Sequence, residues 1–384
     1  MRILIVGAGP SGSSAAYYLA RQKHEVLIID PKAPYEKTCG GGVPSKCLSY
    51  FPEFYADFTP AEYLHDAMVF SFGDKDFCEI PMPGGMGIFS RENHDRHIFE
   101  KAIEAGAVHR PLMFKDCTFD GTSWQVSTDS ENLHCDFIIG ADGATSRVRN
   151  RLAKKLPRES YFKAADYLVS KKGLPLHIGF NKELNGYLWV FPRGENCSVG
   201  IVDFDDDSVR RKKFLEDYFR RFDLEEKDII KKRSALIPSL RKKDLKIHQL
   251  AGKSWALVGD AAALAEPITG EGIYYALRSG KFLAECLRDG KDYNRLWKKE
   301  FGQIVSEAAV SRSSYKILNN SAMKFLLKRS ALMRQMTGNY LAAFENGNKQ
   351  RLKFAATLPL IVLQSLISRP ATCRQFAVQS SQGE

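Results

Sequence analysis

The chain has 384 residues and a formal net charge of +11, and 44% of its residues are hydrophobic while 26% are charged. This composition excludes a disordered or fibrous protein, and the length is sufficient for two or three lobes with large cores. The eight cysteines are scattered without a C-x-x-C pair, which argues against a zinc or iron–sulfur site and favours a reducing, cytoplasmic location.

The N-terminal residues predict a βαβ unit with a glycine-rich turn. Residues 3–6 form an apolar strand rather than a signal peptide, residues 12–21 a helix and residues 25–30 a second strand. The sequence GAGPSG joins the first strand to the helix, a context typical of dinucleotide binding, because its backbone can approach a pyrophosphate. An acid that ends the second strand would accept from a ribose hydroxyl. The residues expected to bind the cofactor here are Gly7, Gly9, Pro10, Ser11, Gly12 and Asp30.

The stretch YEKTCGGGVPSKCL at residues 35–48 places Cys39 directly before three glycines. Consecutive glycines are costly to order, which indicates that the backbone adopts φ > 0 or approaches another group closely. Cys39 is then either a small apolar side chain or part of the site that the backbone approaches. Cys47 lacks such neighbours and is expected to be structural.

The middle of the chain predicts a helix at residues 91–105, which carries Arg91, and a β-rich stretch at 159–202. His94 and His97 lie one turn apart on this helix, but no third ligand is evident, so no metal site is expected. Further strands are expected at residues 68–72 and 77–80 and in SWQVSTD and CDFIIGADG, and further helices at 207–222 and from residue 272 onward.

A second glycine-rich region follows a buried strand in WALVGDAAALAEPITGEGIYYALRSG. It lies about 250 residues after the first turn, which suits an extended cofactor. Its Gly-Asp pair would bond a ribityl hydroxyl, and the backbone of its Gly-Glu-Gly turn would meet an isoalloxazine ring. The segment IIGADGATSRVR adds a third strand–turn–helix element. The residues expected to bind the cofactor in these two regions are Asp142, Gly259, Asp260, Gly270, Gly272 and Ile273.

These elements, in this order, resemble the flavoprotein group with the p-hydroxybenzoate-hydroxylase fold, over roughly residues 1–290. That group has the G-x-G-x-x-G turn, an arginine on a helix as at Arg91, a D-G element and a late G-D element. The resemblance implies an α/β fold with a Rossmann-like domain that binds FAD, a β-rich substrate domain and a helical C-terminal region. The expected domains are residues 1–67 with 88–155 and 250–290 for FAD, 68–87 with 156–249 for the substrate, and 291–384 for the helical, basic region.

Two further motifs, Cys39-Gly40-Gly41-Gly42 and Tyr187-x-Trp189-x-Phe191-Pro192, look like those of the geranylgeranyl reductase family. Its members reduce isoprenoid double bonds in prenyl lipids, chlorophyll side chains or quinone tails, and prenyl diphosphates are a further candidate substrate. The resemblance implies that Cys39 and Gly40 lie beside the flavin, with Cys39 catalytic. It also implies that Tyr187, Trp189, Phe191 and Pro192 line a prenyl cavity. Leu184 departs from the family, which often has proline at that position.

The chemistry of alkene reduction is consistent with these motifs. An isolated C=C bond needs a hydride on one carbon and a proton on the other, in a dry apolar cavity. Tyr187, Trp189 and Phe191 alternate onto one face of a strand, which suits either a cavity wall or an ordinary core. No second strand–GxGxxG–helix unit is present, so electrons would come from transiently docked NAD(P)H or from a separate donor protein such as a ferredoxin.

The last quarter of the chain is basic, with 15 Lys/Arg and 5 Asp/Glu in residues 291–384. Its apolar run at 352–367 is too short to span a membrane. The two features together predict a peripheral contact with an anionic membrane on its cytoplasmic side or an anionic substrate head group, the alternatives being a solvated face and a core helix that closes the cavity. No nucleic-acid-binding module is evident.

Two other functions remain open at this point. A flavin-dependent monooxygenase or halogenase would share the fold, and a halogenase W-x-W-x-I-P strand is partly echoed by YLWVFP. A membrane-associated electron-transfer or redox-sensing flavoprotein would use the basic tail to bind lipid and would have an empty, shallow cavity behind Tyr187.

Overall fold

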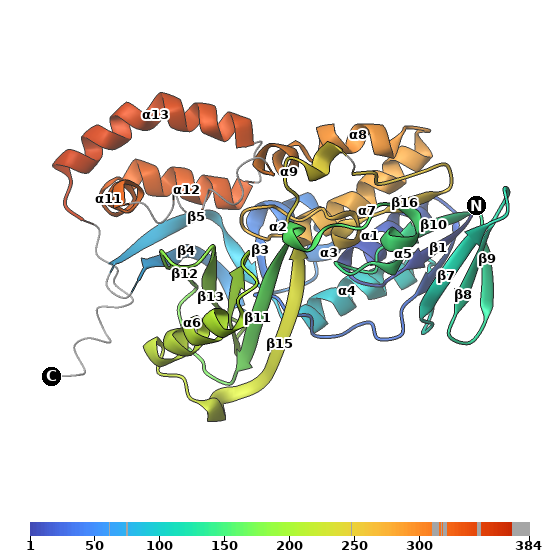
Figure 1. Ribbon diagram of the computed structural model, residues 1–384, viewed down its shortest axis with the longest axis horizontal. Coiled ribbons are helices and arrows are strands. Elements are labelled where there is room, and N and C mark those ends of the chain that lie inside the picture. Colours follow the sequence, from blue (N-terminus) through green and yellow to red (C-terminus); the bar gives the residue numbers. More distant parts are fainter. Residues whose placement is uncertain are drawn as a thin grey trace. The chain divides into compact units, whose positions relative to one another are not determined.

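The computed structural model describes residues 1–370 except 61, 74–75, 247, 309–314, 316, 318–320 and 344–346. The chain divides into two compact units, each built from three separate segments (Figure 1). The first unit comprises Met1–Lys37, Arg91–Phe162 and Leu236–Ala309, and the second comprises Thr38–Ser90, Lys163–Ala235 and Val310–Glu384.

The first unit is organised around a five-stranded parallel sheet in the order β16-β10-β1-β2-β6. Its strands are short and almost entirely apolar, as is typical of a sheet covered on both faces. Their bounds are β1 Arg2–Val6, β2 Glu25–Ile29, β6 Val108–Arg110, β10 Phe137–Gly140 and β16 Trp255–Leu257. A separate antiparallel sheet is formed by β7 Phe114–Phe119, β8 Trp124–Thr128 and β9 Asn132–Cys135.

Two helices of the first unit pack closely against each other, α1 Pro10–Arg21 and α7 Ile273–Arg288. A Cβ atom built on Gly280 would lie 2.6 Å from the backbone nitrogen of Ala15, so only glycine permits this approach. Ser14 Oγ donates to the Leu277 carbonyl at 2.8 Å across the same contact. The other helices of this unit are α4 Arg91–Glu104, α5 Arg147–Leu152, α8 Tyr293–Glu300 and α9 Gly302–Glu307, with the short turns η1 Arg158–Ser160, η3 Asp244–Lys246 and η4 Gly259–Ala262.

The second unit contains most of a mixed eight-stranded sheet in the order β15-β11-β14-β13-β12-β4-β5-β3. The pairs β11–β14, β14–β13, β13–β12, β4–β5 and β5–β3 are antiparallel, and the pair β12–β4 is parallel. The strands are β3 Gly42–Pro44, β4 Glu62–Phe72, β5 Asp76–Ile88, β11 Tyr161–Val169, β12 His177–Phe180, β13 Gly186–Pro192, β14 Cys197–Asp203 and β15 Ile229–Pro238.

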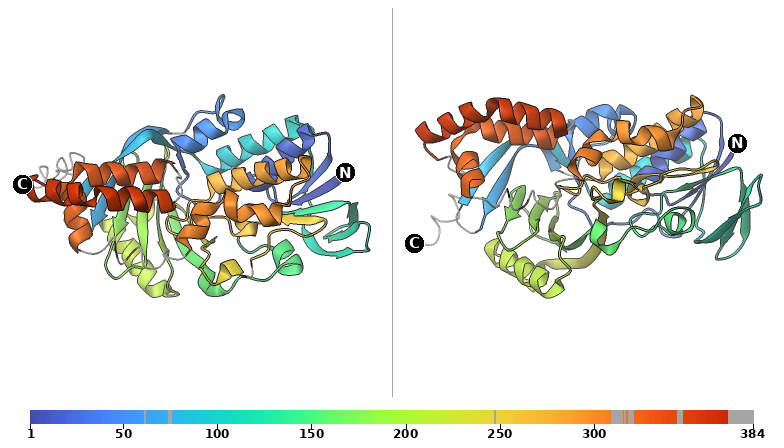
Figure 2. Two further views of the ribbon diagram at one scale, coloured as in Figure 1. Left: turned by 90° about the horizontal axis from the view of Figure 1, so that it is seen from above. Right: turned by 45° about the horizontal axis from the view of Figure 1, so that its top comes forward.

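Helices cover this sheet within the second unit (Figures 1 and 2). Helix α6 Ser208–Arg221 packs its buried side chains against β13 and β14 to form an apolar core. Helix α12 Ala331–Ala343 lies on β5, where a Cβ atom on Gly338 would lie 1.8 Å from the Pro81 carbonyl oxygen. The remaining elements are α2 Ser45–Tyr50, α3 Pro52–Tyr55, η2 Glu226–Asp228, α11 Ser321–Arg329 and α13 Gly347–Ile367.

The unit boundaries differ from the domain ranges expected from sequence. Residues 38–67 belong to the second unit rather than to the nucleotide-binding unit, and the C-terminal quarter is divided near residue 309 instead of forming a lobe of its own. Within the described part of the chain, no helix has the length and apolar character to cross a bilayer.

Candidate active site

The predicted cofactor residues of the first unit gather at one edge of its parallel sheet. Gly7 follows β1, Asp30 follows β2, Asp142 lies just after β10 and Gly259 lies just after β16. These strands pair in parallel, so their carboxyl ends share an edge. In open α/β sheets this edge is where nucleotides bind.

The glycine-rich turn has the geometry that its sequence predicts. Gly7 has φ +107°, and a Cβ atom there would lie 2.4 Å from the Ala141 carbonyl oxygen. A Cβ atom on Gly12 would lie 1.9 Å from the Gly7 oxygen, whereas one on Gly9 would meet nothing within 4 Å. The backbone at Gly9 therefore borders open space at the N-terminus of α1, where a phosphate group is favoured.

Asp30 also braces the glycine-rich turn. One carboxylate oxygen accepts from the Ala8 N–H at 3.0 Å, and the other accepts from the N–H groups of Lys32 and Ala33 at 2.9 and 3.1 Å. The acid thus fixes the turn and retains acceptor capacity for a ribose hydroxyl.

Asp260 forms an ion pair with Lys37, a residue that sequence reasoning missed. The Lys37 ammonium lies 2.8 Å from Asp260 Oδ2, and their side chains are 33% and 16% exposed. Asp260 raises the pKa of the Lys37 ammonium, which is therefore a cation at neutral pH. The guanidinium of buried Arg149 donates to the backbone oxygens of Asp260 and Ala261, which holds the η4 turn in place.

The Gly-Glu-Gly turn stands next to this pair. Gly270 has φ +72°, and a Cβ atom on Gly272 would lie 3.5 Å from Asp260 Oδ1. Glu271 accepts from the Tyr274 N–H at 2.9 Å. Burial, with the nearby carboxylates of Glu266 and Asp260, raises the pKa of Glu271 to about 8. Its carboxyl therefore carries a proton at pH 7 for most of the time, which limits negative charge beside Asp260.

Arg91 and Asp142 make local contacts in the structure. Arg91 forms a two-point ion pair with Asp95 one turn along α4, at 3.0 and 2.6 Å. Although burial opposes ionisation, Arg91 and His94 hold the pKa of Asp95 at about 2. Asp142 accepts from Ser146 Oγ and from the N–H groups that begin α5, so it stabilises the start of that helix. The cofactor contacts expected of Arg91 and Asp142 stay predictions.

The three glycines of the cysteine loop, residues 39–42, pack within the second unit. Cβ atoms built on Gly40 and Gly42 would lie 2.4 and 2.8 Å from the Phe191 ring. Gly41 has φ +84°, and a Cβ atom there would lie 2.0 Å from the Phe89 carbonyl oxygen. The glycines are thus required because the loop lies against one residue of the aromatic strand and against the end of β5.

Hydrogen bonds hold the backbone of the cysteine loop and also involve the sulfur of Cys39. The buried guanidinium of Arg193 donates to the carbonyl oxygens of Cys39 and Gly40. The Gly41 N–H donates to Cys39 Sγ at 3.3 Å, a contact that positions the sulfur against the loop backbone. Among the cysteines in the described part of the chain, Cys39 is the one that is not buried. Cys47 is fully buried, as a structural residue should be.

The aromatic strand β13 presents different residues on its two faces. Leu188 and Val190 belong to the core under α6, while Tyr187, Trp189 and Phe191 share the opposite face. Trp189 is 4% exposed and its ring lies against Gly200, whereas Tyr187 and Phe191 are half-buried. The stripe is thus core at its centre and accessible at its two ends, and Pro192 terminates it in a buried position.

A buried polar chain supports the indole of Trp189. Its Nε1–H donates to Ser198 Oγ at 2.9 Å, and this hydroxyl donates to Asp166 Oδ2 at 2.9 Å. Asp166 and Arg233 form an ion pair whose side chains are 0% and 5% exposed. The indole nitrogen can only donate a hydrogen bond, so this series of hydrogen bonds fixes the orientation of the Trp189 ring.

The comparisons with known proteins agree with this geometry. Residues 5–51 match the model of an NAD(P)-binding Rossmann-like domain, and residues 120–289 match that of an FAD binding domain. A geranylgeranyl diphosphate reductase from Rhodobacter capsulatus is 31% identical over 75% of this chain and 76% of its own length. The chain belongs to the geranylgeranyl reductase family.

Two further proteins are similar to this member of the geranylgeranyl reductase family. A menaquinone reductase from Mycolicibacterium smegmatis is 29% identical over 77% of this chain and 78% of its own length. A geranylgeranyl bacteriochlorophyll reductase-like protein from Thermoplasma acidophilum has the same fold, with a TM-score of 0.73 and 20% identity over 92% of this chain and 98% of its own. The chain is an FAD-dependent oxidoreductase.

The residues of the first unit fit FAD. The open space at Gly9, the acid after β2 and the acid after β16 supply a phosphate approach and two acceptors for sugar hydroxyls. In the part of the chain that the structure describes, no three His, Cys, Asp or Glu side chains are grouped to hold a metal ion.

Replacing Asp260 with alanine should weaken FAD binding. The change removes a charge-assisted hydrogen bond worth about 1.5–3 kcal/mol, which corresponds to an about 10-fold to 150-fold higher Kd. Quenching of flavin fluorescence on titration into the apoprotein measures this constant. Asp289→Ala, at the far end of α7, is the matched control and should bind FAD like the wild type. Full flavin retention in Asp260→Ala would contradict the assignment of Asp260.

Proposed function

We propose that this protein reduces carbon–carbon double bonds of an isoprenoid chain, carried by a prenyl lipid, a quinone tail or a prenyl diphosphate. The observation that supports it most is the packing of the Phe191 ring on Gly40 and Gly42. It joins the cysteine loop and the aromatic strand, the two motifs that distinguish this family, in one unit of the molecule. The two relatives reported above, which each match about three quarters of the chain, are named as reductases, which favours reduction over oxygenation or halogenation.

Each motif has a physical role in this proposal. Bound FAD would supply, in its reduced form, the hydride for one alkene carbon. Cys39 Sγ–H would give a proton to the other carbon, and the Gly41 N–H would stabilise the thiolate left behind until solvent reprotonates it. The half-buried rings of Tyr187 and Phe191 offer a flat apolar surface to the isoprenoid chain. Arg193 keeps the loop backbone from moving, because it bonds two consecutive carbonyl oxygens.

Mass spectrometry of lipid and quinone extracts tests the function directly. Cells that produce the protein should contain an isoprenoid two mass units heavier per saturated bond than the same compound from cells without it. The cell supplies its own electron donor, so the result does not depend on whether this donor is NAD(P)H or a ferredoxin. Oxygenated or halogenated products in place of saturated ones would overturn the proposal.

We also propose that α13 is a peripheral contact with an anionic membrane. This helix is held on its inner side, where Ile361 and Ser365 are fully buried and Gln364 accepts from Ser330 Oγ at 2.6 Å. Its other side carries exposed apolar side chains, namely Leu358, Leu360, Val362, Leu363, Leu366 and Ile367. Contiguous exposed leucines are typical of an interface rather than of solvated surface. Figure 1 shows α13 as the outermost helix over α12.

The wild-type protein should bind phosphatidylglycerol vesicles, and added salt should weaken this binding, because each basic residue near an anionic leaflet contributes about 1 kcal/mol. The double variant Leu363→Asp/Ile367→Asp should bind at least about tenfold less, since it removes two apolar insertions. These side chains are 57% and 77% exposed, so the fold should persist. Flotation with the vesicles measures binding.

Val209→Asp is the control for this experiment, because Val209 is 79% exposed on α6. It should bind vesicles like the wild type. If the double variant instead lowered the melting temperature strongly and the wild type ignored vesicles at any salt concentration, α13 would be a helix that completes the fold.

A further inference from the structure

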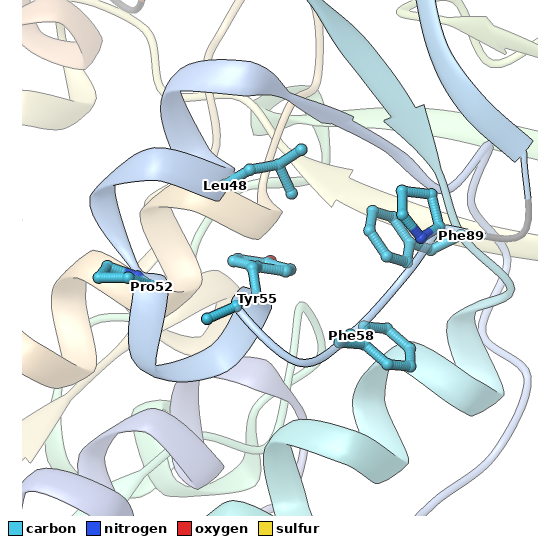
Figure 3. Close-up of a pocket in the computed structure, with 7 residues that line it drawn as sticks. Leu48, Pro52, Tyr55, Phe58 and Phe89 are labelled. Atoms are coloured by element: carbon cyan, nitrogen blue, oxygen red, sulfur yellow. The ribbon is translucent and has the colours of Figure 1, made fainter.

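An apolar cavity of about 220 Å³ opens in the second unit beside helix α3 (Figure 3). We call it the α3 pocket. In the view of Figure 3, the side chains of Leu48, Tyr55 and Phe89 converge on it from α2, from α3 and from the end of β5. It is lined by Leu48, Pro52, Tyr55, Ala56, Phe58, Pro60 and Phe89. None of these residues is charged, so the pocket favours an apolar ligand over a polar one.

The pocket has a rigid aromatic wall. The rings of Phe58 and Phe89 stack at 5.3 Å with an angle of 16°, and Tyr55 lies 6.0 Å from Phe89. Gly87 makes room for this wall, because a Cβ atom there would lie 3.0 Å from both the Phe89 ring and Pro60. A preformed pocket loses little conformational entropy when it binds a ligand.

One wall residue of the pocket also holds the cysteine loop. The Phe89 N–H donates to the Gly41 carbonyl oxygen at 2.9 Å, while Gly41 packs on the Phe89 backbone and its own N–H bonds Cys39 Sγ. The pocket and the loop are therefore parts of one hydrogen-bonded assembly. A ligand group that fills the pocket contacts Phe89, which fixes the position of the loop.

We propose that the α3 pocket binds an apolar end of the isoprenoid chain and thereby sets the chain length that the enzyme accepts, an inference that rests on the proposed function. The volume supports this occupant: a dry apolar cavity of about 150 Å³ holds benzene, so this one holds on the order of one to two five-carbon isoprene units. A chain of twenty carbons has four isoprene units, so it can fill the pocket and still present units for reduction, whereas a chain of ten carbons has only two units in all.

Ala56→Trp tests this inference by filling the pocket. Ala56 is exposed and has helical φ and ψ, so a large side chain is tolerated there. The FAD-loaded enzyme is dialysed against tritiated geranylgeraniol or geraniol, probes that share the chain and lack the variable head group. The variant should bind geranylgeraniol at least about tenfold more weakly, since it forfeits burial of an isoprene unit, while geraniol binding changes little.

Thr59→Trp is the matched control, because Thr59 is exposed in the same loop and does not line the pocket. It should bind both probes like the wild type. Gly87→Ala, which presses on two wall residues, should weaken geranylgeraniol binding as well and replaces Ala56→Trp if that variant does not fold. Wild-type binding of geranylgeraniol in folded Ala56→Trp or Gly87→Ala would overturn the inference. Pocket-dependent binding without any reduction of prenyl compounds would support the pocket and overturn the proposed function.

Discussion

Replacing Cys39 with alanine should lower the rate of alkene reduction by a factor of about 10²–10⁴, because a positioned general acid contributes that much to a proton transfer. The variant should still be yellow, since the cofactor residues of the first unit are untouched. Cys39→Ser should retain only part of the rate, because its hydroxyl can still donate a proton but is a weaker acid than the thiol. Single-turnover oxidation of the prereduced enzyme by the isoprenoid, followed at the flavin absorbance, measures the rate.

Cys286→Ala controls for the loss of a thiol as such, because Cys286 is buried in α7. It should react like the wild type. Equal rates for wild type, Cys39→Ala and Cys39→Ser would show that Cys39 is not the proton donor and serves only as a small apolar side chain. The glycine loop would then serve only to support Phe191. The alternative of a flavin-dependent monooxygenase or halogenase would then be favoured again.

The nucleotide-binding half of the fold could be predicted from sequence because its signals are local. A strand, a glycine-rich turn, a helix and an acid follow one another within thirty residues, and each feature restricts the next. The late Gly-Asp element was recognisable for the same reason. The parallel sheet then brings these local elements to one edge, a consequence of topology that the motifs already imply.

The cysteine loop shows where sequence reasoning stopped. Three glycines indicated a close approach, but the groups approached include Phe191, about 150 residues away, and the backbone of Phe89. Contacts between distant segments leave no periodic signal in the chain. Arg193 was missed although it directly follows the aromatic motif, because an arginine next to a proline carries no pattern of its own.

The role of a polar residue is difficult to predict from sequence for a related reason. A D-G element predicts an acid at the cofactor, which stays a prediction, and Asp142 also accepts hydrogen bonds from Ser146 and from the first N–H groups of α5. Asp and Ser at a helix start are capping residues in many proteins, and a motif does not say which role prevails. The helices α2 and α3 were not predicted either, since six and four residues are too few to show a helical period.

Replacing Arg233 with methionine should destabilise the fold by about 3–5 kcal/mol, because it leaves the carboxylate of Asp166 buried without its partner. Asp166 is fully buried, and its other side-chain contact is the hydroxyl of Ser198. Chemical unfolding at pH 7 measures the loss. The near-ultraviolet circular dichroism of the indoles should change as well, since this carboxylate orients Trp189 through Ser198.

The double variant Asp166→Asn/Arg233→Met should recover most of this stability, because neither charge of this ion pair is left to bury. The pH dependence gives an independent check. Burial raises the pKa of Asp166 in the folded protein, so its contribution to stability is present below the unfolded pKa of about 4 and is lost as the pH rises through the folded value. Without the Arg233 guanidinium beside it, the pKa of Asp166 in the folded protein rises further. The stability deficit of Arg233→Met should therefore nearly vanish at pH 4 and grow toward pH 7. A deficit that stays constant over this range, or a double variant as unstable as the single one, would show that Arg233 acts through packing rather than through the charge of Asp166.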